Sequence, residues 1–79
     1  MENRTEQEIK LINREKLSLT CVRSVLAFED DYLKIDTETG VIIAEGKDLL
    51  IENLSKDRGE IYVVGKINKI EFYEPKKKR

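Results

Sequence analysis

Apolar and polar residues alternate along most of this chain. Leu17, Leu19 and Cys21 are separated by single polar residues, and the segment 32–36 follows the same rhythm. Alternation with period two is typical of strands that bury one face and expose the other. We therefore expect about seven or eight short strands, in the segments 9–11, 17–21, 22–28, 32–36, 41–45, 49–54, 60–64 and 67–73.

Two glycine pairs set the turns between the later strands. Gly40 and Gly46 bracket five residues, and the same spacing returns nineteen residues later at Gly59 and Gly65, each second glycine being followed by Lys. Glycine accepts the left-handed backbone that tight hairpin loops require. We expect all four glycines to be structural turn residues, with hairpin loops ending at Gly40 and Gly59, a turn at 46–48 and a bend at Gly65.

The pattern predicts an all-β fold, a small antiparallel, immunoglobulin-like β-sandwich of about seven short strands. A partly open barrel and a short β-solenoid, suggested by the nineteen-residue echo, remain alternatives. A helix competes only over residues 4–16, where Asn13 and Lys16 break the helical period. We divide the chain into a flexible N-terminus at 1–8, a single β domain at 9–74 and a basic C-terminal tail at 75–79.

Composition excludes several kinds of site. The 79 residues include fifteen basic and sixteen acidic ones, for a net charge of −1, so no nucleic-acid footprint is expected. The chain contains no His and a single Cys, which excludes an internal disulfide and a Cys/His zinc cluster. Cys21 is in phase with buried positions, so we expect a small buried apolar side chain there.

No pattern typical of catalysis or of ligand binding is present. The Gly-Lys pairs at 46–47 and 65–66 lack the spacing and the following Ser or Thr of a phosphate loop, and the acidic run 29–31 is expected to be a solvated turn, because consecutive acids cannot all face one ion. We predict no catalytic, cofactor-binding or metal-binding residue, no cofactor, no small-molecule substrate and no enzymatic activity.

An alternative is a small module that binds nucleic acid or another anionic polymer. It would use the basic tail 76–79, Lys66, Lys69 and an exposed Tyr62. Tyr62 is out of phase with its buried neighbours, whereas Phe28 and Phe72 are expected to fill the core.

The sequence also indicates a compartment. No apolar run approaches the roughly 18 residues needed to span a membrane, and residues 1–8 lack the apolar segment of a signal peptide. With a single Cys, these features favour a reducing cytoplasm.

Six segments in order carry a family pattern: two opening strands at 9–20, a bend and an acidic turn at 22–30, a hairpin at 33–40, the Gly-Lys-Asp-Leu turn at 46–49, a loop at 54–60 and a closing strand at 64–72. Their order and spacing resemble the YabP family of sporulation proteins, including its YqfC type, over Ile9 to Tyr73. The chain departs from the family at Cys21, where a Gly is expected before the Val.

The resemblance implies a non-enzymatic sporulation protein of an endospore-forming bacterium, made in the cytoplasm of the mother cell and associated with the spore coat. It implies a role in coat assembly as a scaffold component. Its partners would be other sporulation or coat proteins, and self-association stays open. The resemblance supplies no cofactor and no site residue.

Overall fold

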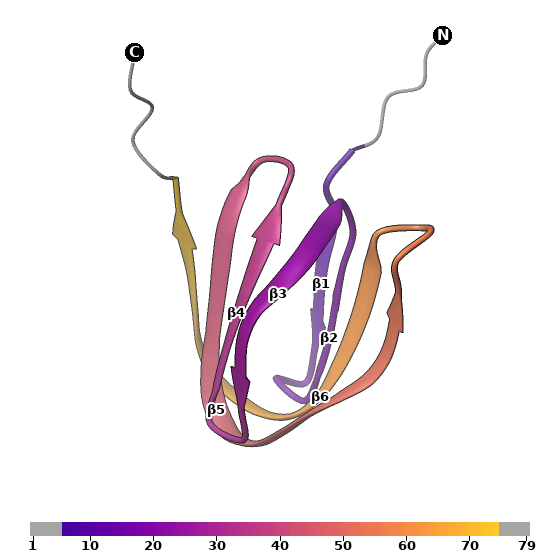
Figure 1. Cartoon of the computed structure of the whole chain (residues 1–79). Coiled ribbons are helices and arrows are strands. Elements are labelled where there is room, and N and C mark those ends of the chain that lie inside the picture. The colour runs from indigo at the N-terminus through magenta and orange to yellow at the C-terminus, as the bar shows by residue number, and fades with distance from the viewer. Residues whose placement is uncertain (1–5, 75–79) are drawn as a thin grey trace, which may run out of the picture.

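Six antiparallel strands form one sheet in the computed structural model, which describes residues 6–74 (Figure 1). The sheet order is β1-β2-β6-β5-β4-β3. The strands are β1 (Ile9–Ile12), β2 (Lys16–Leu19), β3 (Val22–Glu29), β4 (Tyr32–Thr37), β5 (Gly40–Ser55) and β6 (Glu60–Tyr73). The all-β prediction is confirmed, and the open curled sheet is compatible with both a sandwich and a partly open barrel.

The predicted strand count was too high because two expected breaks are bends. The segments 41–45 and 49–54 belong to the single strand β5, and 60–64 and 67–73 belong to β6. The turn predicted at 46–48 is therefore a bend within β5, where the β5–β6 pairing shifts register. Residues 9–12 form a strand, so the helix that competed for this segment is wrong.

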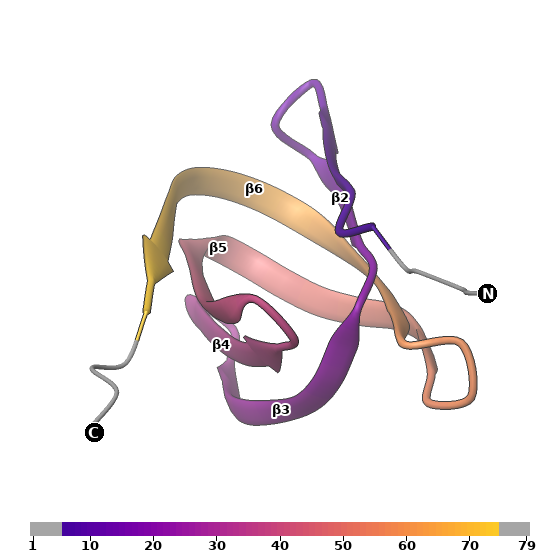
Figure 2. The same ribbon diagram turned by 90° about the horizontal axis from the view of Figure 1, so that it is seen from above.

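The two bent strands fold the sheet over on itself (Figure 2). One layer contains β1, β2, the first half of β6 and the second half of β5, and the other contains the remaining halves with β4 and β3. Their facing side chains form one core, which consists of Leu17, Leu19, Val22, Leu33, Ile35, Ile42, Ala44, Leu49, Ile61, Val63 and Ile67. Each fully buried aliphatic side chain stabilises the fold by about 1.5–3 kcal/mol.

Glycines stand where β5 and β6 bend across each other. A Cβ atom on Gly46 would collide with the carbonyl group of Lys66, and one on Gly65 would collide with the carbonyl group of Asp48. Gly65 also has a φ of 135°, which L side chains rarely adopt. The backbones can therefore approach at the bends only because both positions lack a side chain.

The turns of the two outer hairpins hydrogen-bond to these bends. In the β1–β2 turn, the carbonyl of Glu15 accepts from the N–H of Gly65 at 3.1 Å. In the β3–β4 turn, the carbonyl of Asp31 accepts from the N–H of Gly46 at 3.1 Å. Each long strand thus has a glycine bend held by a hairpin turn. This arrangement accounts for the repeat of the glycine pairs at a nineteen-residue interval. From the sequence alone, that repeat was also consistent with a β-solenoid.

The end of the predicted flexible segment 1–8 is tied to the sheet. The carbonyl of Glu8 accepts from the N–H of Thr20 at 3.1 Å, and the side-chain amide of Gln7 donates to the carbonyl of Thr20 at 3.0 Å. Ordered backbone therefore begins before Ile9. Residues 1–5 and the basic tail at 75–79 lie outside the described residues.

Candidate interaction surface

Two regular stretches of sheet edge lie on the same side of the long strand β6. β1 pairs with β2 and forms the end of the sheet within the described residues. β2 in turn pairs with β6 only over Ile61–Val64, so the later segment Lys69–Tyr73 of β6 pairs with β5 on one side alone. Backbone groups on such edges are available to a further strand.

The backbone of β1 presents Ile9 and Leu11 to the open edge. The carbonyl of Glu8 accepts from Thr20, and the N–H of Glu8 donates to the Thr20 hydroxyl at 2.7 Å, so residue 8 faces the β2 side. Successive residues of a strand direct their N–H and C=O groups to opposite sides. Residues 9 and 11 therefore direct theirs away from β2.

The same reasoning places Ile70 and Phe72 on the open edge of β6. The N–H of Val22 donates to the carbonyl of Gly59 at 2.9 Å, so the backbone groups of Val22 point away from β4. Thr37, which pairs with Val22 across β3 and β4, therefore directs its own backbone groups away from β3 and toward β5. The β4–β5 and β5–β6 registers then determine that residues 69, 71 and 73 of β6 direct their backbone N–H and C=O groups toward β5. The backbone groups of residues 70 and 72 point the other way.

Both edges carry apolar side chains on the core side of the sheet. Ile9 and Leu11 lie opposite buried residues of β2, yet they are 36% and 40% exposed. Phe72 lies opposite buried Ile42 and is 68% exposed. The prediction that Phe72 fills the core is wrong, because the sheet ends at this half of β6 and no strand covers the ring from the side.

The other outer strand, β3, is a less regular edge. Its pairing with β4 shifts register between Val22 and Ser24 and again between Val25 and Ala27. Bulges of this kind disrupt pairing with a further strand. Phe28, also predicted in the core, is 41% exposed on this strand, so that prediction is wrong as well.

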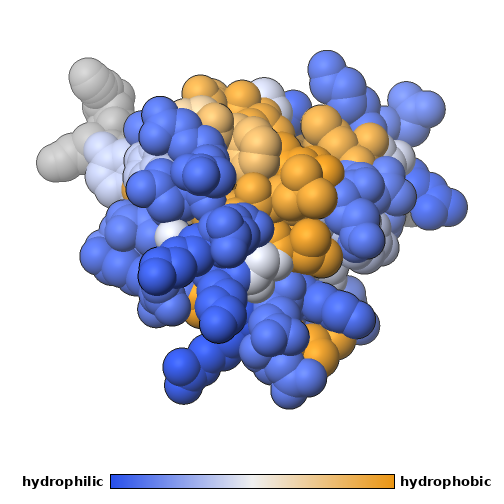
Figure 3. Space-filling model, turned by 90° about the horizontal axis from the view of Figure 1, so that it is seen from below, coloured by the Kyte–Doolittle hydropathy of each residue, from blue (hydrophilic) through white to orange (hydrophobic). Residues whose placement is uncertain are grey.

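The outer face of the sheet carries a further row of apolar side chains, which Lys16 interrupts. Cross-strand pairing aligns Ile12, Lys16, Val64 and Leu50, of which Ile12 and Leu50 are more than half exposed. Viewed from below, apolar surface gathers across the middle of the molecule between polar side chains (Figure 3). Tyr62 is exposed, as the sequence predicted.

The residues of the anionic-polymer hypothesis do not form a purely basic surface. Tyr62 shares a shallow hollow with Lys10, Lys16 and Glu52. Lys66 lines a neighbouring hollow that also holds Glu15 and Asp48, and Lys69 lies 3.5 Å from Glu71. The charges on this side are therefore mixed.

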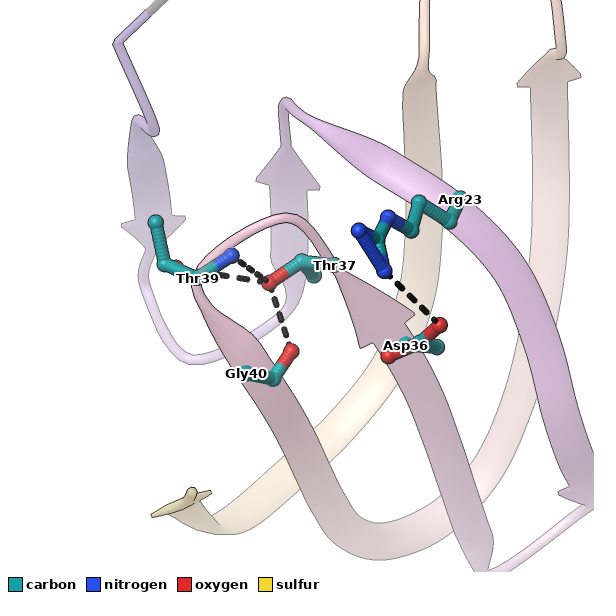
Figure 4. A network of polar contacts seen from close by, with 5 residues as sticks. All are labelled: Arg23, Asp36, Thr37, Thr39 and Gly40. Atoms are coloured by element: carbon teal, nitrogen blue, oxygen red, sulfur yellow. Dashed lines mark hydrogen bonds and ion pairs between the residues drawn. The ribbon is translucent and has the colours of Figure 1, made fainter. Parts of the chain in front are cut away.

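The hairpin loop that ends at Gly40 contains a buried polar contact. Thr37, which is 2% exposed, donates its hydroxyl hydrogen to the carbonyl of Gly40 at 2.6 Å and accepts from the N–H of Thr39 at 3.3 Å (Figure 4). Beside it, Arg23 and Asp36 form a partly exposed ion pair at 3.8 Å. These contacts fasten the loop and offer no reactive group.

The four predicted turn glycines fall into two groups. Gly40 and Gly59 end hairpin loops with φ of 137° and 65°, and Gly46 and Gly65 lie at the strand bends. Gly59 packs against the backbone of Val22, where an added Cβ would stand 3.1 Å from the carbonyl oxygen. Sequence spacing singled out all four glycines, but the turn expected at Gly46 is a bend within β5, and the crossing of backbones at the two bends was not predicted.

Cys21 is buried, as predicted, and lies at the bend between β2 and β3 with a φ of 60°. Glycine adopts this left-handed conformation readily. The position at which the chain departs from the family pattern is therefore one whose backbone conformation suits glycine.

The structure gives no metal or membrane feature within residues 6–74. No group of three or more His, Cys, Asp and Glu residues there is placed to hold a metal ion. The acidic run 29–31 lies at the β3–β4 turn, where the carbonyl of Asp30 accepts from the N–H of Leu49 at 2.8 Å. In the same range, no helix is long and apolar enough to cross a membrane.

The model of the YabP family matches residues 3–79, nearly the whole chain. The chain belongs to the YabP family. Membership in this family implies a sporulation-related protein, as the resemblance of the six segments suggested. A search of curated proteins found no match to the chain. The family assignment indicates a process, and the open edges of β1 and β6 are candidate surfaces for contact with other proteins.

Proposed function

We propose that this YabP family protein is a non-enzymatic scaffold component of spore coat assembly, made in the mother cell, that acts through protein–protein contacts. Family membership supports the link to sporulation. The observation that carries the mode of action is the pair of regular open edges on β1 and β6, each with half-exposed or exposed apolar side chains. Strand addition at such an edge combines backbone hydrogen bonds with side-chain contacts.

Its partners are other sporulation or coat proteins, including further copies of the chain. The mixed surface charge favours specific docking at the edges over indiscriminate association, because interspersed charges oppose contact elsewhere.

The test is to follow an epitope-tagged chain in the sporulating bacterium that encodes it. We expect the protein to appear in the mother cell after sporulation begins and to fractionate with the coat of mature spores. A deletion strain should form spores with a coat defect that the tagged gene repairs. Expression in vegetative cells alone, or spores with an unaltered coat in the deletion strain, would contradict the proposal.

The alternative, binding to an anionic polymer, retains one supporting observation, since Tyr62 shares its hollow with Lys10 and Lys16. It predicts salt-dependent retention of the chain on an anionic matrix even after residues 76–79 are removed. Our proposal expects no retention of the truncated chain at physiological salt, because Glu52, Glu15 and Asp48 lie among the basic residues.

A further inference from the structure

We propose that the edge of β1 in one copy of this chain pairs antiparallel with the Lys69–Tyr73 edge of β6 in a second copy. The inference deepens the proposed function, on which it rests, by naming the surface and the partner of the scaffold contact. Both edges are regular, and both lie wholly within the described residues.

Backbone direction limits the possible registers. Ile9 and Leu11 face the edge of β1, and Ile70 and Phe72 face the edge of β6. In an antiparallel pair, residues that face each other exchange hydrogen bonds. Ile9 must therefore lie opposite residue 70, 72 or 74 of the second copy, which leaves three registers that use this edge.

The charges of directly opposite residues favour one of the three registers. With Ile9 opposite Ile70, Lys10 would face Lys69 and Glu8 would face Glu71, and like charges directly opposite destabilise a strand pair. With Ile9 opposite Glu74, Lys10 would face Tyr73 and gain no charged partner. With Ile9 opposite Phe72, Lys10 faces Glu71, so opposite charges meet.

The selected register also matches the apolar side chains. Ile9 then lies opposite Phe72 of the second copy, and Leu11 lies opposite Ile70 of that copy. All four side chains are on the core side of the sheet, where each edge exposes apolar surface in a single copy. Phe72 is the most exposed large apolar side chain of the described residues, at 68%. The pairing covers it and joins the cores of the two copies.

The two edges differ from each other, so the contact is heterologous. Each copy keeps one β1 edge and one β6 edge, and the contact can repeat from copy to copy or close into a ring. Head-to-tail addition of identical subunits suits a scaffold.

Charge exchange provides the first test. Lys10→Glu places two acidic residues opposite each other at the contact, and Glu71→Lys places two basic ones. Each variant alone should associate at least about tenfold more weakly than the wild type, since both replace an attractive pair by a repulsive one. An equimolar mixture should recover the wild-type affinity, because each contact then joins unlike charges. Lys16→Glu, on the outer face of β2, should associate like the wild type.

Disulfide trapping tests the register. Ile9→Cys and Phe72→Cys, mixed under mild oxidation, should form an intermolecular disulfide, since hydrogen-bonded antiparallel partners have Cα atoms about 5.5 Å apart. Neither variant should cross-link when alone, because Cys21 is buried and equal positions do not meet.

Light scattering and non-reducing gels read out both experiments. Recovery in the charge mixture together with the 9–72 disulfide supports the inference. Failure of the mixture to recover, or cross-linking in either single variant instead of the mixture, overturns it. A coat-associated protein that stays monomeric would refute this contact and leave the proposed function standing. A chain that associates as described but is absent from spores would support this contact and refute the proposed function.

Discussion

Gly65 and Asp48 lie so close at the crossing of the two long strands that a Cβ atom on Gly65 would stand 2.5 Å from the carbonyl oxygen of Asp48. We expect Gly65→Ala to destabilise the fold by about 3 kcal/mol or more, because the new methyl group meets rigid backbone and the φ of 135° is unfavourable for alanine. Urea unfolding followed by circular dichroism measures the change.

The matched control for this variant is Lys66→Ala at the neighbouring exposed position, which should change stability by less than about 0.5 kcal/mol. Equal stability of Gly65→Ala and Lys66→Ala would contradict the close crossing of β5 and β6.

The hairpin loops require positive φ at Gly40 and Gly59. Gly40→Val and Gly59→Val should each destabilise the fold by at least about 1 kcal/mol, because a β-branched residue resists this conformation. Gly59→Asn should cost less than Gly59→Val, since Asn tolerates the left-handed region. Thermal unfolding of the three variants checks the order, and unchanged stability in both valine variants would refute our interpretation of these loops.

The buried hydroxyl of Thr37 should contribute measurably to stability. Thr37→Val keeps the shape but leaves the carbonyl of Gly40 and the N–H of Thr39 without this partner, at a cost of about 1–3 kcal/mol. Thr39→Val, at an exposed position, should cost less. Denaturant unfolding compares the two variants, and a larger loss for Thr39→Val would show that the hydrogen bonds of Thr37 are not what fastens the loop.

Cys21 should tolerate glycine better than a branched residue. At a φ of 60°, Cys21→Gly relieves backbone strain while it loses a small buried side chain, so we expect a net change within about 1 kcal/mol. Cys21→Val should destabilise more, because its branched Cβ is unfavourable there. Calorimetry of both variants measures the difference, and a valine variant at least as stable as the glycine variant would contradict the left-handed bend.

Local pattern was sufficient to predict the strands but not their continuity. Period-two alternation located the buried faces at Leu17, Leu19 and Val63, because each lies in a strand with one wet face. The local sequence around Gly46, in the segment 46–48, is equally consistent with a turn and with a bend inside one strand. The structural role of Gly46 depends on Lys66, a residue twenty positions away along the chain that no local pattern connects to it.

The exposure of Phe72 was unpredictable for a related reason. Its phase places it on the core side of the sheet, where it does lie, opposite Ile42. Whether a core-side residue is covered depends on the sheet order, and here β2 leaves β6 after Val64. The residues of the candidate interaction surface were therefore not predicted from the sequence, although the order of turns and strands was sufficient to identify the family.

The measurement that tests self-assembly through these edges most directly is light scattering coupled to size-exclusion chromatography over a concentration series of the wild-type chain. We predict a weight-average mass that rises with concentration beyond that of the monomer, and a smaller rise at equal concentration for Lys10→Glu. A wild-type mass that stays at the monomer value across the series would contradict self-assembly through the β1 and β6 edges.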